Sequence, residues 1–168
     1  MHSLNIVHCD IKPSNVIYNK QTGKLTLVGF NLSKQLNSLD EKMHQPYGTF
    51  LYMAPEMIIE KEYDYTVDWY AYGKTLLLLF GGTIEMEEES VGNGVNVTFL
   101  NNFFPLNDAQ DKLISHCIDD KKEERIRSLD QIKKHKYFRG FQWDTIHDEL
   151  NTAELSFFRR LLNFIFQK

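Results

Sequence analysis

The pattern of hydrophobic and polar positions changes along the chain and predicts strands at the front and helices behind. Two short β-prone runs, residues 15–18 and 24–28, flank the turn-forming residues 21–23, which predicts a β-hairpin. Residues 31–55 are mostly polar and contain two prolines, so they predict an extended loop. The dense apolar run at 67–80 is rich in leucine and too long for a typical strand, so it predicts a buried helix.

Behind that helix the pattern predicts a loop and then further helices, which makes the fold class mainly α. The glycines at 81–82 are expected to end the helix. Residues 85–102 open with a run of glutamates and continue with Gly and Asn, so we expect a surface loop with at most a short helix there. Asn107 and Ser128 can each cap a helix, and 153–166 has an amphipathic pattern. The apolar positions of that last segment are Leu155, Phe158, Leu162 and Ile165.

Composition narrows the class of protein without naming a function. The 168 residues allow one modest domain, and a hydrophobic share of 42% is enough for a core. A net charge of −4 argues against a nucleic-acid partner, because such binding depends on neutralising phosphates. Two cysteines make no disulfide framework, and the most apolar run is too short to cross a bilayer. We therefore expect a protein without a transmembrane segment, in the cytoplasm or the nucleus.

The strongest candidate for chemistry is the short segment 8–15. It brings a carboxylate, an amine and a carboxamide together ahead of the predicted hairpin. Asp10 could accept the proton of an attacking hydroxyl, Lys12 could neutralise charge on a transferring phosphoryl group, and Asn15 could bind a divalent cation. The alternative is a polar turn with a structural role only.

The spacing of these residues resembles the catalytic loop of eukaryotic protein kinases, H-R-D-x-K-x-x-N. Four further segments match that family in the right order. They are the strand and D-F-G region at 25–33, the end of an activation segment with an intact A-P-E triplet at 48–56, the start of the central helix at 68–73, and an AGC-like end of the domain at 132–144.

The resemblance implies a helical carboxy-terminal kinase lobe with a small β-hairpin over residues 1–143, followed by a tail at 144–168. It implies phosphoryl transfer from ATP with Mg²⁺ to protein serine or threonine, with Asp10, Lys12, Asn15 and Thr49 as catalytic residues. Thr49 would bridge Asp10 and Lys12, and Ile17 would lie beneath adenine. Structural roles are implied for His8, Phe30, Glu56, Asp68 and Arg125, including an ion pair between Glu56 and Arg125 and a hold of Asp68 on the catalytic loop.

The sequence departs from the family pattern at two positions in the expected site. Gly29 replaces the D-F-G aspartate, the usual magnesium ligand, so Asn15 is the main ligand left. Asn31 could alternatively stand in for it from two residues away. Cys9 replaces the arginine of H-R-D and could be either a reactive thiol or a small apolar filler.

The residues before His8 contain no glycine-rich loop and no strand lysine, so the sequence predicts a chain without an amino-terminal lobe. Three functional hypotheses follow. The chain is a catalytically impaired, pseudokinase-like module that binds a protein partner or substrate, such as another kinase. Alternatively it is a truncated fragment of a longer active serine/threonine kinase, or a lobe that interferes with a complete kinase. The C-terminal segment is expected to pack on the lobe or a partner rather than on a membrane surface.

Overall fold

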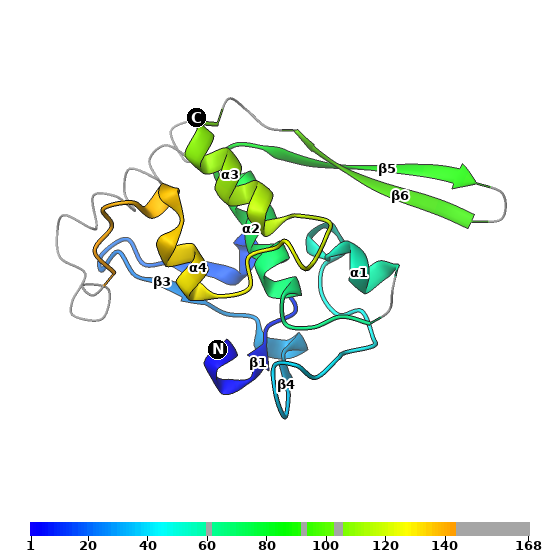
Figure 1. Ribbon diagram of the computed structural model, residues 1–168, viewed down its shortest axis with the longest axis horizontal. Helices are drawn as coiled ribbons and strands as arrows, with labels where there is room; N and C mark the ends of the chain where they lie inside the picture. The colour runs from blue at the N-terminus through cyan, green and yellow to red at the C-terminus, as the bar shows by residue number, and fades with distance from the viewer. Residues whose placement is uncertain (60–61, 92–93, 103–105, 144–168) are drawn as a thin grey trace.

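The computed structural model describes residues 1–59, 62–91, 94–102 and 106–143 (Figure 1). Its α-helices are α1 (Pro55–Ile58), α2 (Val67–Leu79), α3 (Asp108–Cys117) and α4 (Leu129–Lys134). Its strands are β1 (Ile6–Val7), β2 (Val16–Tyr18), β3 (Leu25–Leu27), β4 (Lys34–Gln35), β5 (Thr83–Val91) and β6 (Gly94–Asn102).

Helix α2 lies at the centre of the molecule, and it confirms the buried helix predicted at 67–80. Most of its side chains are buried, as expected of a helix that is apolar on all sides. It ends at Leu79 with Phe80 as its C-cap, and Gly81 follows with a φ of 90°, the left-handed conformation that commonly ends helices. Helix α3 packs directly against it.

Two small antiparallel sheets occupy the front of the chain. Strands β2 and β3 form the predicted hairpin, with Ile17 opposite Thr26. Strand β1 pairs with β4, with Val7 opposite Lys34. The candidate catalytic loop at 8–15 runs from the end of β1 to the start of β2, so both sheets fix its ends.

The two capped helices are also confirmed. The Asn107 side chain accepts hydrogen bonds from the backbone N–H groups of Ala109 and Gln110, and the Gln110 side chain accepts from the Asn107 N–H. This reciprocal arrangement is a capping box, which satisfies donors that α3 would otherwise leave unpaired. Ser128 caps α4 by accepting from the Gln131 N–H.

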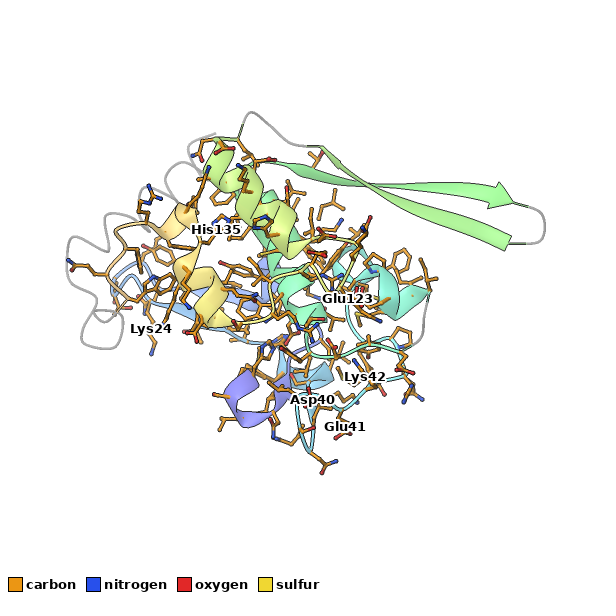
Figure 2. All side chains as sticks on the ribbon, viewed as in Figure 1. Lys24, Asp40, Glu41, Lys42, Glu123 and His135 are labelled. Atoms are coloured by element: carbon orange, nitrogen blue, oxygen red, sulfur yellow. The ribbon has the colours of Figure 1, made fainter. Side chains whose placement is uncertain are left out.

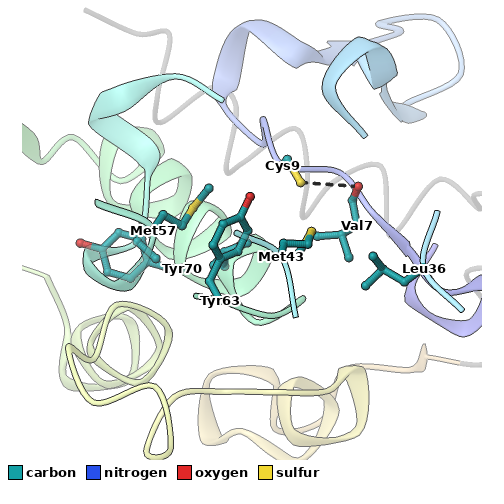
Figure 3. Packing of buried hydrophobic residues seen from close by; sticks show 9 residues of the cluster. Val7, Cys9, Leu36, Met43, Met57, Tyr63 and Tyr70 are labelled. Carbon is teal, nitrogen blue, oxygen red and sulfur yellow. Dashed lines mark hydrogen bonds between the residues drawn. The ribbon is translucent and has the colours of Figure 1, made fainter. Parts of the chain in front are cut away.

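The core consists of two clusters that share α2. The first joins β1, the segment from Leu36 to α1, and the start of α2, and Figure 3 shows it from close by. Its buried members are Val7, Cys9, Leu36, Met43, Ala54, Met57, Tyr63, Val67 and Tyr70. The second joins the end of α2 to α3 and α4, with Leu77, Leu113, Ile114 and Cys117 fully buried.

The prediction of a surface loop at 85–102 is wrong. Strands β5 and β6 pair there over nine consecutive positions, from Thr83 opposite Asn102 to Val91 opposite Gly94. The resulting hairpin extends away from the rest of the molecule (Figure 1). The described residues are therefore helix-rich with three two-stranded antiparallel sheets, so the mainly α expectation holds only in part. The predicted amphipathic helix and the tail at 144–168 lie outside the described residues.

The described helices include none that is both long and apolar enough to span a bilayer.

Candidate functional site

Asp10 is the residue on which the site converges. Its carboxylate is almost fully buried, with the residue 8% exposed. Oδ1 accepts hydrogen bonds from the Thr49 N–H at 3.0 Å and the Thr49 hydroxyl at 2.7 Å. Oδ2 lies 2.8 Å from Lys12 Nζ and accepts from Asn15 Nδ2 at 2.9 Å. The structure thus brings together all four side chains that the sequence picked out as catalytic candidates.

Thr49 connects the two charged members of this group. Lys12 Nζ donates to the Thr49 hydroxyl oxygen at 2.5 Å, while that hydroxyl donates to Asp10. Burial alone would raise the pKa of the Asp10 carboxyl, but the hydrogen bonds from Lys12, Thr49 and Asn15 together lower it below its usual value. Asp10 is therefore a carboxylate at neutral pH, which can accept a hydrogen bond from a hydroxyl and orient it.

Asn15 occupies the space in which a side chain at position 29 would begin. Gly29 has a φ of 85°, and a Cβ built on it would lie 2.6 Å from Asn15 Cγ. Asn15 Nδ2 also donates to the Asp10 carbonyl oxygen at 2.7 Å. The amide is thus held between Asp10 and the Gly29 backbone, while Asn31 lies exposed in the turn that follows.

These residues do not fit the magnesium site that the family resemblance implies. Gly29 offers no ligand, and the Asn15 amide supplies one neutral oxygen, whereas Mg²⁺ prefers carboxylates and phosphates. Within the described part of the chain, no group of three or more His, Cys, Asp or Glu side chains is placed to hold a metal ion.

The apolar residues beside the site are exposed. Ile17 on β2 is 54% exposed and Phe30 is 49% exposed. Leu25, on β3 of the same hairpin, is exposed as well. Phe30 contacts the ring of His8 edge-on at 4.7 Å between centroids. Ile17 is therefore on an open surface and can contact a bound molecule from one side.

Asp68 fixes the loop from the first turn of α2. Its carboxylate is buried and accepts from the backbone N–H groups of His8 at 2.8 Å and Cys9 at 2.9 Å. His8 Nδ1 accepts from the Asp10 N–H, so His8 Nε2 carries the hydrogen that reaches the Val28 carbonyl oxygen at 3.1 Å. The backbone of the loop around Asp10 is thus bound both to Asp68 on α2 and, through His8, to the residue that follows β3.

Glu56 and Arg125 form a buried bidentate ion pair. Arg125 Nη1 lies 2.6 Å from Glu56 Oε1, and Nη2 lies 3.1 Å from Oε2. Nε and Nη2 also donate to the Asp119 carbonyl oxygen, and the guanidinium lies over the Tyr70 ring. The pair connects α1 to the loop before α4 and does not contact Asp10. Its position is therefore that of a structural ion pair.

The sequence did not predict the structural roles of Gly48 and Asp64. A Cβ at Gly48 would lie 2.1 Å from the Cys9 carbonyl oxygen, so only glycine lets the segment before Thr49 approach the loop at 8–15 this closely. Asp64 accepts from the Thr66 N–H and hydroxyl. It also pairs with Lys42, which is labelled in Figure 2, at 2.9 Å. The signals available were the Gly48-Thr49 pair and the Asp-x-Thr spacing at 64–66.

Cys9 is a small buried core residue and not a reactive thiol. It lies in the first core cluster with a φ of 64°, and its sulfur contacts the Val7 carbonyl oxygen at 3.8 Å (Figure 3). Burial, with a smaller contribution from the nearby Asp68 charge, raises the pKa of the Cys9 thiol to about 12. The thiolate needed for nucleophilic chemistry is therefore not formed at neutral pH.

Comparison with known proteins finds sequences similar to this chain. A sequence model described as "Protein kinase domain" matches residues 1–138. The chain is 27% identical over 153 residues to ribosomal protein S6 kinase alpha-6 of Homo sapiens, covering 88% of this chain and 20% of that protein. It is 29% identical over 157 residues to serine/threonine-protein kinase Sgk1 of Rattus norvegicus, covering 87% of this chain and 35% of that protein. Ribosomal protein S6 kinase-related protein of Homo sapiens is 29% identical over 148 residues, covering 86% and 36%. The chain thus spans between a fifth and about a third of the length of these relatives.

Proposed function

Because the chain belongs to the protein kinase family, we propose that it is a serine/threonine kinase-like module that binds a protein partner and is catalytically impaired. Protein kinases transfer the terminal phosphoryl group of ATP with the help of Mg²⁺. In this chain, the residues that would handle the acceptor hydroxyl are assembled, whereas those that would hold the metal are not.

The observation that carries the proposal is the Asn15 amide over Gly29. The metal-binding aspartate of the family has no counterpart, and its starting position is filled by Asn15. Metal ions at such sites supply several kcal/mol of charge stabilisation, and about 1.4 kcal/mol changes a rate tenfold. A loss of several powers of ten in phosphoryl transfer is the expected consequence.

The retained residues define what the site still does. Asp10 can accept a hydrogen bond from a serine or threonine hydroxyl, and Lys12 can contact a phosphate, with Thr49 fixing both side chains. The exposed apolar side chains of Ile17 and Phe30 beside it give a protein partner a surface to cover.

Phosphate transfer tests the impairment. The purified chain is incubated with radiolabelled Mg-ATP and a library of serine- and threonine-containing peptides, beside the matched variant Asp10→Asn. We expect incorporation that does not exceed that of the variant. Transfer well above Asp10→Asn would overturn the proposal.

Nucleotide and partner binding are tested separately. A thermal melt with and without Mg-ATP is expected to show one cooperative transition and no shift, because a bound ligand would raise the melting temperature. Co-purification is then compared between the natural chain and the surface variant Ile17→Lys. Equal recovery of the same partner by both chains would contradict a partner on this surface.

A second candidate is favoured by the intact contacts of Asp10, Lys12 and Thr49. The chain could be part of a longer serine/threonine kinase that is itself active. Reading the transcript upstream of Met1 tests this, since an in-frame glycine-rich loop and strand lysine are required. Stop codons in every frame would exclude it.

A further inference from the structure

The hairpin β5–β6 presents two long outer edges. Its strands pair over nine positions, and no strand among the described residues pairs with the outer side of either one. The hairpin also extends away from α2 and α3 (Figure 1). Unpaired strand edges are templates for further strands, so proteins normally protect them, often with charge.

Only one of the two edges is protected by charge. Strand β5 carries four glutamates within five residues, at positions 85, 87, 88 and 89, whereas β6 carries no charged residue. Strand β6 instead has β-prone residues at 95, 97, 98 and 99. The edge formed by β6 is therefore the one suited to accept another strand.

We propose that β6 pairs in antiparallel fashion with β6 of a second copy of this chain, centred on Thr98, so that two hairpins form one four-stranded sheet. Antiparallel pairing of identical strands about a two-fold axis is self-complementary. In this register Thr98 stands opposite the second copy's Thr98, and Val97 stands opposite its Phe99. Threonine pairs and aromatic–β-branched pairs are both favourable across strands.

The register also brings the apolar positions of the two β6 strands next to each other. Met86 pairs with Phe99 within the hairpin, and residues two apart lie on the same face of a strand. Positions 95, 97 and 99 of β6 therefore share one face, on which their partners in β5 are Ser90, Glu88 and Met86. Joining two hairpins along β6 sets the apolar β6 positions of the two copies side by side at the seam and leaves the glutamate-bearing strands at the two outer edges.

Charge excludes the corresponding pairing through β5. An antiparallel β5–β5 pair centred on Glu87 would set Glu87 opposite its own copy and Glu85 opposite Glu89. Like charges directly opposite each other destabilise a strand pair. The same glutamates protect the outer edges of the four-stranded sheet, so association is expected to stop at two chains. This inference is independent of the proposed kinase-like function.

Sedimentation velocity over a concentration series tests the proposal with two matched variants of the full chain. Thr98→Lys and Glu87→Gln each raise the net charge of −4 by one, and both change the same cross-strand pair. In Thr98→Lys the new lysine stands opposite Glu87 within its own hairpin, which favours the hairpin, but opposite a second lysine across the proposed seam. We expect a species of about twice 19.8 kDa for the natural chain and for Glu87→Gln, and its loss in Thr98→Lys.

A cross-linking measurement locates the seam. Thr98→Cys places two cysteines opposite each other at the two-fold axis, whereas Glu87→Cys places them on the outer strands. Cys9 and Cys117 are buried and do not compete. Mild oxidation is expected to give a disulfide-linked dimer of Thr98→Cys and none of Glu87→Cys on a non-reducing gel. A natural chain that stays monomeric, or equal cross-linking of both variants, would overturn the proposal.

Discussion

At the scale of single residues, the site depends on one carboxylate whose hydrogen-bond partners come from two segments of the chain. Asp10 receives Lys12 and Asn15 from its own loop, and Thr49 from a segment 39 residues further along. Thr49 is the member that joins the two segments, because its hydroxyl accepts from Lys12 and donates to Asp10. Removing that hydroxyl therefore changes the electrostatics of Asp10 without touching its own loop.

Thr49→Ala is expected to raise the pKa of the Asp10 carboxyl towards its ordinary value. A carboxyl whose pKa is lowered in the folded state stabilises the protein above its unfolded pKa, and that stabilisation is lost as pH falls through the folded pKa. The natural chain should therefore lose more stability than Thr49→Ala on acidification below about pH 4. A carboxyl-detected NMR titration with urea unfolding at several pH values measures both effects. Thr49→Ser should behave like the natural chain, and an Asp10 pKa equal in all three chains would contradict the role given to the hydroxyl.

Gly29→Ala is expected to lower the free energy of unfolding by about 1–2 kcal/mol from the left-handed backbone alone. A further loss should come from the clash of the new Cβ with Asn15. The double variant Asn15→Ala, Gly29→Ala removes the clash but keeps the backbone strain. Urea unfolding should therefore show a double variant more stable than the sum of the two single changes predicts. Strict additivity would show that Asn15 does not obstruct position 29.

At the scale of elements, α2 buries a lysine as well as Asp68. Lys74 is 0% exposed, and its Nζ lies 5.5 Å from the centre of the Tyr70 ring. Burial lowers the pKa of this lysine from 10.5 to about 8, although the charge of Asp120 acts in the opposite direction. The folded chain can therefore release this proton at a pH where the unfolded chain still holds it.

Lys74→Met is expected to change how stability depends on alkaline pH. Between about pH 8 and pH 10.5 the unfolded natural chain binds more protons at this position than the folded one, so raising the pH stabilises the folded state. The natural chain should thus gain stability relative to Lys74→Met across this interval. Urea unfolding of both chains at matched pH isolates the effect from that of tyrosines and cysteines. Lys24→Met, at an exposed lysine, serves as the control and should run parallel to the natural chain.

The elements that the sequence predicted correctly are those with strong local signals. The length and leucine content of 67–80 predicted α2, and Asn107 and Ser128 predicted the starts of α3 and α4. The hairpin β5–β6 was missed because glutamate, glycine and asparagine all disfavour strands. The alternation at Val95, Val97 and Phe99 was the available signal, but its partner strand could be recognised only from the pairing itself.

At the scale of the whole molecule, the Glu56–Arg125 pair holds together segments 69 residues apart. Both side chains are buried, with Arg125 donating further to the Asp119 carbonyl oxygen. The pair lies between the first core cluster, which contains Met57, and the loop leading to α4. It therefore contributes to how the front and back of the molecule meet.

Arg125→Met is expected to lower the free energy of unfolding by about 3–5 kcal/mol, because it leaves the Glu56 carboxylate buried without its partner. The double variant Glu56→Met, Arg125→Met removes the unpaired charge and should recover much of that loss. Chemical denaturation of the three chains measures the difference. If the double variant is no more stable than Arg125→Met, the loss comes from packing and not from the charge.

Long-range contacts also mark the limit of what could be predicted about the site. The spacing of 8–15 predicted the residues of the loop, and the family resemblance implied partners for Thr49, Asp68 and Glu56. The steric relation of Asn15 to Gly29, and that of Gly48 to Cys9, depends on backbone paths that no local pattern specifies. For the same reason the burial of Lys74 could not be anticipated from a helix that reads simply as apolar.

The hold of Asp68 on two backbone N–H groups has a consequence for how the molecule opens. The loop can release the His8 and Cys9 amides only by taking two backbone donors from the buried Asp68 carboxylate, which also contacts His2 Nε2 at 2.9 Å, so local opening there is unfavourable. The two amide hydrogens should exchange with deuterium at the slow rate of α2, while those of exposed residues such as Lys20 exchange quickly. In Asp68→Asn, His8 and Cys9 should exchange faster than α2. The loop at 8–15 and the central helix are thus expected to form and to unfold together, as one cooperative unit.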